Sequence, residues 1–239
     1  MSKVNVVRSL HRRRAHGDPL VLPGPWDAAS ARVFAEAGFP ALATPSAGVA
    51  ASLGYADGSV PADEMFAAVA RIARAVDVPV SADVEGGYGL PPKELVERLL
   101  EAGAVGCNLE DSHGGVLKDP HEHADWLAEV RSAAADLLFV NARIDTFARG
   151  VTDPSQALQR AALYVAAGAE CVYPIHAPVA VLPLLRSGIQ GPIKVRGRLD
   201  GEGPSPAELG GLGATRVTFG PGFQRRSMPA LREIADGSR

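Results

Sequence analysis

The sequence is poor in cysteine and in aromatic residues. Its 239 residues include only two cysteines, and aromatic side chains make up 5% of the chain. So few cysteines exclude a small disulfide-built scaffold. Cys107 and Cys171 both lie inside apolar, strand-like runs, which indicates buried, inert thiols in a reducing compartment. The cytoplasm is therefore the expected location.

Long apolar runs and a strong charge bias are also missing. No run approaches the roughly 20 apolar residues that span a bilayer, and the N-terminal residues lack the apolar stretch of a signal peptide. The formal net charge is -3. The one basic cluster, residues 8–16, has no interleaved aromatic residues and indicates a solvated helix face. Neither a membrane nor a nucleic-acid partner is expected.

Short β-type runs alternate with alanine-rich stretches along almost the whole chain. The expected strands are residues 20–22, 41–44, 79–82, 104–109, 137–141, 170–173, 193–195 and 216–219. The expected helices are residues 27–37, 61–75, 91–102, 124–135, 154–167, 179–187, 205–210 and 224–234. Eight strand–helix units in about 240 residues predict an α/β fold, a single-domain (β/α)8 TIM-type barrel.

Two segments stand apart from this repeat. Residues 1–18 are expected to form an N-terminal helical extension, and the polar, glycine-bearing residues 111–124 an active-site lid loop. The alternative fold is an open doubly wound sheet. That fold commonly carries a GxGxxG turn after its first strand, whereas residues 23–27 read Pro-Gly-Pro-Trp-Asp.

Charged residues end three successive predicted strands. Asp83 and Glu85 follow one strand, Glu110 the next and Arg143 the third. The carboxyl ends of parallel strands meet at one edge, so these side chains are expected to gather there. Taken singly, Asp83 and Glu110 could instead cap the helices that follow, because acidic residues favour helix N-termini.

Such a cluster suits a hard cation. Mg²⁺ prefers oxygen ligands and keeps several waters, so one direct carboxylate with others acting through water is a normal design. The guanidinium of Arg143 matches a substrate carboxylate, but it could equally neutralise Glu110 or Asp145.

Small residues follow the second predicted strand. Ser46, Ala47 and Gly48 come directly after Thr44-Pro45 and could form an anion cradle from free backbone amides. Trp26, after the first strand, could line the pocket or simply pack in the core.

Several histidines and one lysine are further candidates. In the lid, His113 and Lys118 are the candidates for proton transfer or charge stabilisation. His121 and His123 are expected to begin a helix and to be solvated rather than to bind zinc. His176 ends a later strand, where it could line the pocket or pack.

From about residue 20 to 231 the chain resembles the isocitrate lyase/phosphoenolpyruvate (PEP) mutase superfamily, in particular its short PEP-mutase-like branch. The resemblance rests on several motifs that occur in order. They are Leu-Pro-Gly-Pro-Trp-Asp-Ala-Ala-Ser-Ala at 22–31, Ser-Ala-Gly-Val-Ala at 46–50, Leu-Gly-Tyr-Ala-Asp at 53–57, Ala-Asp-Val-Glu-Gly-Gly-Tyr-Gly at 82–89, Asn-Leu-Glu-Asp at 108–111 and Ala-Arg-Ile-Asp at 142–145.

The resemblance implies a role for each of these positions. Asp83 would bind Mg²⁺ directly (Mn²⁺ is an alternative), while Asp57, Glu85 and Glu110 would hold its waters. Residues 46–48 would bind the oxo-acid end of a small-molecule substrate, and Arg143 its carboxylate. Family members make or break C–C or P–C bonds beside a pyruvate-like unit. They form homo-oligomers, commonly tetramers that exchange the last helix, and a dimer or tetramer is expected here.

Departures from the family pattern narrow the expected reaction. The lid lacks the cysteine that isocitrate and methylisocitrate lyases use to handle a proton. Lys118 has no asparagine or threonine beside it to serve phosphoryl transfer. The main hypothesis is therefore a Mg²⁺-dependent C–C lyase that acts on a small 2-oxo or 2-hydroxy diacid through an enolpyruvate-type intermediate. A phosphonopyruvate mutase or hydrolase, and a non-catalytic oxo-acid-binding protein, are the alternatives.

Overall fold

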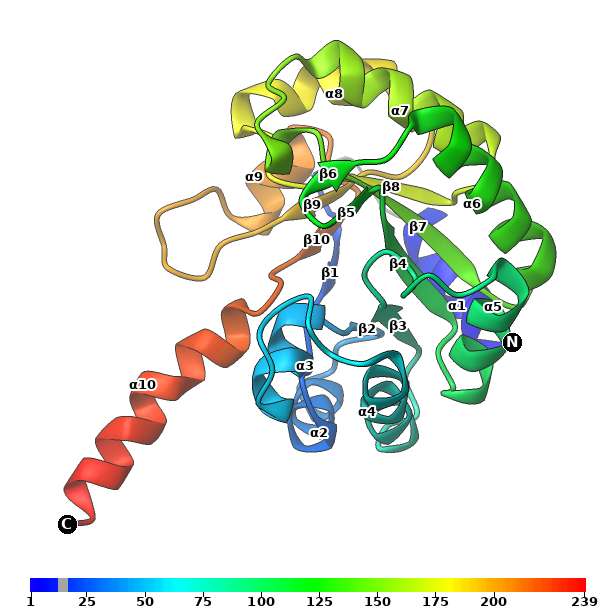
Figure 1. Cartoon of the computed structure of the whole chain (residues 1–239). Helices are drawn as coiled ribbons and strands as arrows, with labels where there is room; N and C mark the ends of the chain where they lie inside the picture. The colour runs from blue at the N-terminus through cyan, green and yellow to red at the C-terminus, as the bar shows by residue number, and fades with distance from the viewer. Residues whose placement is uncertain (13–16) are drawn as a thin grey trace.

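A computed structural model describes residues 1–12 and 17–239 and shows parallel strands curled around a common axis (Figure 1). One sheet has the order β2-β3-β4-β7-β8 and the other β1-β10-β9, with every pairing parallel. The strands are β1 (Leu20–Leu22), β2 (Leu42–Ala43), β3 (Val80–Asp83), β4 (Gly106–Glu110), β7 (Phe139–Ile144), β8 (Cys171–Pro174), β9 (Lys194–Arg196) and β10 (Arg216–Thr218).

Two further contacts join the sheets into a ring. A parallel bridge pairs Val172 in β8 with Ile193, the residue before β9. The amide of Ala43 in β2 donates to the carbonyl of Pro23, just after β1, over 3.1 Å. The fold is thus a single-domain TIM-type barrel, as the sequence predicts.

Helices cover the outside of this ring and bury their apolar faces against it. They are α2 (Ala28–Glu36), α3 (Ser46–Leu53), α4 (Ala62–Arg74), α5 (Pro92–Glu101), α6 (Pro120–Ala134), α7 (Pro154–Ala166), α8 (Leu182–Gly188) and α9 (Pro206–Gly211), with 3₁₀ turns at Phe147–Arg149 and Val179–Val181. The last helix, α10 (Gly222–Gly237), extends away from the ring (Figure 1). Asp27, Asp119, Asp153 and Ser205 cap four of these helices through their side chains. No helix in the described part of the chain is long and apolar enough to cross a membrane.

The structure differs from the expected elements in two places. Residues 46–53 form a helix, α3, where the sequence indicated only small loop residues. Residues 111–124 are not a continuous loop. They hold a two-stranded hairpin, β5 (Ser112–His113) with β6 (Val116–Leu117), and then the first turn of α6, which Asp119 caps four residues earlier than expected. Movement of this segment as a lid stays a prediction.

The N-terminal helix α1 (Lys3–Arg12) packs against the amino-terminal ends of the barrel strands. Val4 and Val7 pack against Phe139 and Cys171, the first residues of β7 and β8. The prediction of a solvated basic face is wrong for Arg8, whose Nε donates to Glu170 over 2.6 Å and whose side chain is 11% exposed. A basic side chain on this face binds the barrel because α1 lies across it. Residues 13–16 of the basic cluster lie outside the described part.

Candidate active site

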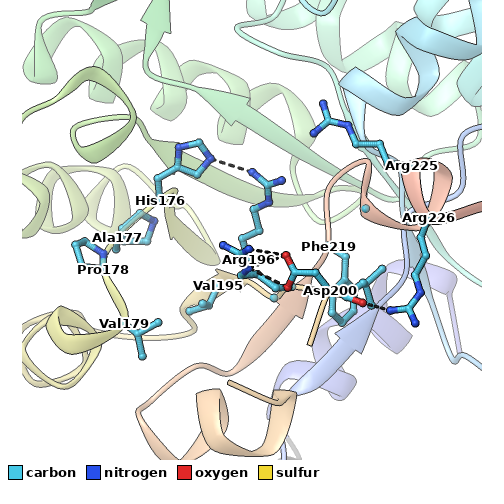
Figure 2. A pocket seen from close by; sticks show the side chains of 15 residues that line it. His176, Ala177, Pro178, Val179, Val195, Arg196, Asp200, Phe219, Arg225 and Arg226 are labelled. Carbon is cyan, nitrogen blue, oxygen red and sulfur yellow. Dashed lines mark hydrogen bonds and ion pairs between the residues drawn. The ribbon is translucent and has the colours of Figure 1, made fainter. Parts of the chain in front are cut away.

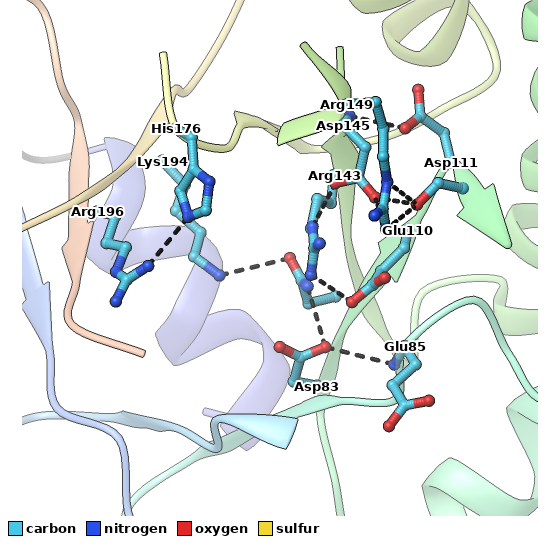
Figure 3. Close-up of polar contacts among 12 residues, drawn as sticks. Asp83, Glu85, Glu110, Asp111, Arg143, Asp145, Arg149, His176, Lys194 and Arg196 are labelled. Atoms are coloured by element: carbon cyan, nitrogen blue, oxygen red, sulfur yellow. Dashed lines mark hydrogen bonds and ion pairs between the residues drawn. The ribbon is translucent and has the colours of Figure 1, made fainter. Parts of the chain in front are cut away.

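The carboxyl ends of the barrel strands surround a cavity of about 200 Å³ (Figure 3). Asp83 and Arg143 reach it from β3 and β7, and Lys194 from β9. The remaining lining residues are Ala43, Thr44, Pro45, Ser46, Ala47, Asp57, Tyr173, Ile175, His176, Arg196, Thr218, Gly220, Pro221 and Arg225. Residues that are far apart in sequence therefore line one cavity.

Asp83 is held in place by neighbouring strands. Its Oδ1 accepts a hydrogen bond of 3.1 Å from Nδ2 of Asn108 on β4, and its backbone amide donates to the hydroxyl of Thr44 over 3.0 Å. In the part of the chain that the structure describes, no cation forms an ion pair with Asp83. The side chain is thus oriented but its charge is not neutralised.

Arg143 joins two carboxylates. It donates through Nη1 to Glu110 and through Nε to Asp145, the second bond being 2.5 Å long. The structural alternative for Arg143 is therefore confirmed, although the same side chain also lines the cavity. Neither Asp83 nor Glu110 caps a helix, since α5 starts behind Pro91 and α6 behind Asp119. That alternative is wrong.

Glu85 opens onto a second cavity of about 470 Å³, which shares Asp57 and Arg143 with the first. Glu110, Tyr88 and His113 also line it. Burial, followed by the nearby Asp83 charge, raises the pKa of Glu85 to about 7 and that of Glu110 to about 8. Oε1 of Glu85 is buried without a hydrogen-bond partner.

Backbone strain gathers around the same space. Among the described non-glycine residues, four have positive φ angles, and three of them, Glu85 (53°), Tyr88 (56°) and His176 (61°), line a cavity. Such conformations are unfavourable for residues with a side chain and persist where the surroundings impose them, often at functional sites. The turn after β3 is thus built at a conformational cost that aims Glu85 into the cavity.

The acidic residues fit a divalent cation in charge and in donor type. Their carboxylate oxygens are the donors that a hard cation prefers, and Oε1 of Glu85 is buried without a hydrogen-bond partner, so it could accept from a water on such a cation. Burial and the neighbouring Asp83 charge raise the pKa of Glu85 and Glu110, and a bound cation would oppose that effect. Across the described residues, no three acidic, histidine or cysteine side chains stand close enough to ligate one ion together. A single direct carboxylate with the others acting through water stays a prediction.

The N-terminus of α3 forms part of the cavity wall. Ser46 and Ala47 are its first residues and both line the cavity. The amides at the start of a helix have no partner within it and point outward, which favours an anion. Gly48 follows in the same turn and lies outside the cavity lining, with its carbonyl accepting a hydrogen bond from Gln224 over 3.0 Å. A Cβ at Gly48 would come within 2.9 Å of the Pro45 ring, so glycine is needed for this close packing.

The hairpin that follows β4 is anchored to α7 through Asp111. Asp111 is fully buried and accepts hydrogen bonds from Nη1 of Arg160 (3.0 Å) and from the hydroxyl of Tyr164 (2.8 Å), both on α7. It also accepts from the amide of Asp145 over 2.7 Å. These contacts fix the start of the hairpin, while its tip at Gly114 and Gly115 is exposed and lines the 470 Å³ cavity.

Comparison with known proteins identifies the family to which this chain belongs. The sequence profile of the phosphoenolpyruvate phosphomutase family matches residues 7–238. The chain belongs to this family. It is 33% identical over 181 residues to the 2-methylisocitrate lyase of Aeropyrum pernix, which covers 71% of this chain and 57% of that protein.

Comparison with solved structures also finds proteins that share this fold. A Burkholderia cenocepacia J2315 protein with a provisional phosphonomutase assignment matches with a TM-score of 0.89 and 38% identity, covering 98% of this chain and 99% of that one. Phosphonopyruvate hydrolase in complex with oxalate and Mg²⁺ has the same fold, with a TM-score of 0.88 at 20% identity over 99% of this chain and 86% of that one. The isocitrate lyase/PEP mutase superfamily consists of Mg²⁺-dependent lyases and mutases.

Against this family background, some predicted residues stand outside the cavities. The ring of Trp26 packs edge-on against Phe34. Lys118 lies over the ring of Trp126 and donates to the carbonyl of Glu110 over 3.3 Å, behind the acidic cluster. Trp26 and Lys118 line neither the 200 Å³ nor the 470 Å³ cavity.

The histidines differ in burial, which their spacing in the sequence did not indicate. His113 is exposed on the hairpin and lines the 470 Å³ cavity. His121 and His123 lie in the first turn of α6, as expected, but the prediction that both are solvated is wrong for His123. It is buried and stacked on Trp126, and burial lowers its pKa to about 3. A residue two positions along a helix points elsewhere, here into the core.

Sequence reasoning missed the basic residues of the cavity. Lys194 and Arg196 on β9 and Arg225 on α10 were not singled out, yet all three line it. Arg196 forms a 3.0 Å hydrogen-bond contact through Nη1 with Nε2 of His176, and Figure 2 shows this pair at the edge of a wider, open cavity of about 860 Å³. The available signal was the alternation of basic and apolar residues in 193–196.

Proposed function

We propose that this chain is a Mg²⁺-dependent lyase that cleaves a C–C bond in a small 2-oxo or 2-hydroxy diacid through an enolpyruvate-type intermediate. The observation that carries the proposal is the pairing of two opposed features in one cavity. Asp83, whose charge is not neutralised, faces the N-terminal amides of α3 and the guanidinium of Arg143. The cavity therefore offers adjoining sites for a cation and for a substrate carboxylate.

Each residue has a defined task in this scheme. Asp83 would ligate the cation, while Asp57, Glu85 and Glu110 would orient its water ligands. The α3 amides at Ser46 and Ala47 would hold the oxo-acid end, and Arg143 would fix the carboxylate in one plane. Arg143 is itself positioned by Glu110 and Asp145, so it arrives pre-oriented.

The bound cation would act as a Lewis acid that stabilises negative charge developing on the oxo oxygen and carboxylate. The protein supplies the surroundings. Pro45, Tyr173 and Ile175 line the same cavity with apolar surface, which limits water access and strengthens the electrostatic contacts inside.

The position of Lys118 favours C–C over P–C chemistry. The resemblance assigns a lid lysine to phosphoryl transfer, but here the ammonium contacts Trp126 and the Glu110 carbonyl outside both cavities. A transferring phosphoryl group would thus lack that cation in the described arrangement.

Oxalate, a planar analogue of an enolpyruvate, tests the proposal directly. We expect calorimetry to detect oxalate binding that weakens at least roughly ten-fold when Mg²⁺ is removed with a chelator, because the cation would bridge ligand and Asp83. Turnover assays would use oxaloacetate, a substituted-malate panel and phosphonopyruvate. Oxalate binding that does not depend on Mg²⁺ would contradict the proposed site. Faster cleavage of phosphonopyruvate than of any diacid would select the P–C alternative.

We also propose that the chain forms a homo-oligomer through α10. This helix projects away from the barrel (Figure 1), and Met228, Leu231 and Ile234 form one exposed stripe at three-residue spacing. A second copy of the chain would cover this stripe, because α10 leaves the barrel that it would otherwise pack against. We expect Leu231→Glu to lower the molar mass measured by analytical ultracentrifugation. A monomeric wild-type protein, or an unchanged mass in the variant, would contradict the expectation.

A further inference from the structure

Lys194 is a buried amine inside the active-site cavity. It is the first residue of β9, and its side chain points to the barrel interior rather than to solvent, with 6% of the residue exposed. Figure 3 shows it reaching toward the space above Asp83 from the side opposite Arg143. A lysine in this position differs from the surface lysines of the chain, for example Lys93, whose side chain is 83% exposed.

The ammonium has unusually little to balance its charge. Nζ lies 3.4 Å from Oδ1 of Asn108 and 4.0 Å from the centre of the Tyr173 ring. Within the described chain it forms no ion pair with a carboxylate. Its neighbour in register on β10 is another buried cation, Arg216, whose Nε and Nη1 lack hydrogen-bond partners.

This setting makes the neutral amine accessible near neutral pH. Burial, and then the charge of Arg216, lower the pKa of Lys194 to about 7. The charged or titratable groups that face it from the surrounding strands are Asp83 on β3, Arg143 on β7, Cys171 and Tyr173 on β8, and Arg216 on β10.

From its place in the cavity and its missing counter-ion, we propose that Lys194 is the catalytic acid–base that carries a proton to and from C3 of the substrate. This role rests on the proposed function, since it requires an enolate in the cavity. The lid lacks a cysteine, Lys118 lies outside the cavity, and His113 lies at the exposed hairpin. Lys194 is the aliphatic amine that shares the cavity with Asp83 and Arg143.

The step balances without another reactant. After bond cleavage, the C2–C3 enolate takes a proton from the Lys194 ammonium. The N–H bond breaks and a C3–H bond forms, while the electron pair on the enolate oxygen restores the C2 carbonyl. The amine is left neutral and regains a proton from water before the next turnover. In reverse, the neutral amine removes a C3 proton from a 2-oxo acid.

Exchange of the C3 protons of pyruvate in D₂O, followed by NMR, measures this step without knowledge of the natural substrate. We expect the wild-type protein with Mg²⁺ to catalyse exchange. Its kcat/KM should rise as pH increases through about 7, because removal of the proton requires the neutral amine. Lys194→Met and Lys194→Arg should each lower the exchange rate by roughly 100-fold or more, because methionine carries no proton and arginine does not release one.

Controls separate this role from folding and from the proposed function. Both variants should keep Mg²⁺-dependent oxalate binding and a cooperative thermal transition, and Lys93→Gln should exchange like the wild type. Wild-type exchange in either Lys194 variant would overturn the role, and so would oxalate binding by a wild-type protein that exchanges no protons. Borohydride trapping of pyruvate on Lys194 would overturn it too, by showing a nucleophile instead. If the wild-type protein shows no Mg²⁺-dependent oxalate binding, the proposed function itself is wrong.

Discussion

Replacing Asp83 by asparagine should lower Mg²⁺-dependent turnover by at least roughly a thousand-fold, because the cation would lose its direct anionic ligand while the shape of the cavity is preserved. Asparagine can still accept the hydrogen bond from Asn108, and the backbone bond to Thr44 is unaffected. Steady-state kinetics on the best diacid of the panel, with Mg²⁺ varied, would measure the loss. Magnesium titration should also show that Mg²⁺ no longer tightens oxalate binding.

A matched control comes from the same strand region. Asp77 is exposed in the turn between α4 and β3, at the other end of the barrel, so Asp77→Asn removes the same charge far from the cavity. We expect this control to keep wild-type activity, and both variants to show thermal transitions near that of the wild type. Undiminished turnover in Asp83→Asn would remove the central support for the proposed site.

The barrel could be predicted because each strand carries its own local signal. All eight predicted strands occur in the expected order, since short apolar runs bounded by glycine, proline or a helix cap mark them independently of tertiary contacts. The acidic cluster could be predicted for the same reason. Once the strands are parallel, the residues that follow them must share one edge.

Helix α3 could not be predicted from the same kind of pattern. Its sequence, Ser-Ala-Gly-Val-Ala-Ala-Ser-Leu, has no charged face, and tertiary packing rather than amphipathic spacing stabilises it. Residues 46–48 were assigned an anion-binding role as loop residues. In the structure that role, still a prediction, falls to the amides of a helix N-terminus, with Gly48 needed for packing against Pro45.

Lys194 was missed because an alternation of polar and apolar residues along a strand has a different cause in a closed barrel. The alternation Ile193-Lys194-Val195-Arg196 is typical of a strand with one solvated face. Here helices cover the outer face and the inner face lines the cavity, so the basic residues of β9 point into the barrel. Charge on a strand of a (β/α)8 barrel is therefore a signal for the site, even away from the strand end.

Breaking the buried contact between Asp111 and Arg160 is expected to destabilise the protein strongly, because it would leave a buried carboxylate without its cation. The carboxylate is fully buried, and the Arg160 side chain is 9% exposed. Arg160→Met keeps much of the side-chain volume but leaves Asp111 without its cation, which should cost about 3–5 kcal/mol of unfolding free energy. Arg160 also donates to the carbonyl of Lys118 over 2.9 Å, so the hairpin should loosen as well.

Chemical denaturation at several pH values would identify the buried charge as the cause. Burial already raises the pKa of Asp111, and loss of Arg160 should raise it further. An acid with a raised pKa in the folded state can take up a proton at low pH, so the cost of Arg160→Met should be small in acid and grow as pH rises. The double variant Arg160→Met/Asp111→Asn should recover part of the loss at neutral pH, because no buried charge remains. A pH-independent cost with no recovery would instead assign the effect to lost packing around α7.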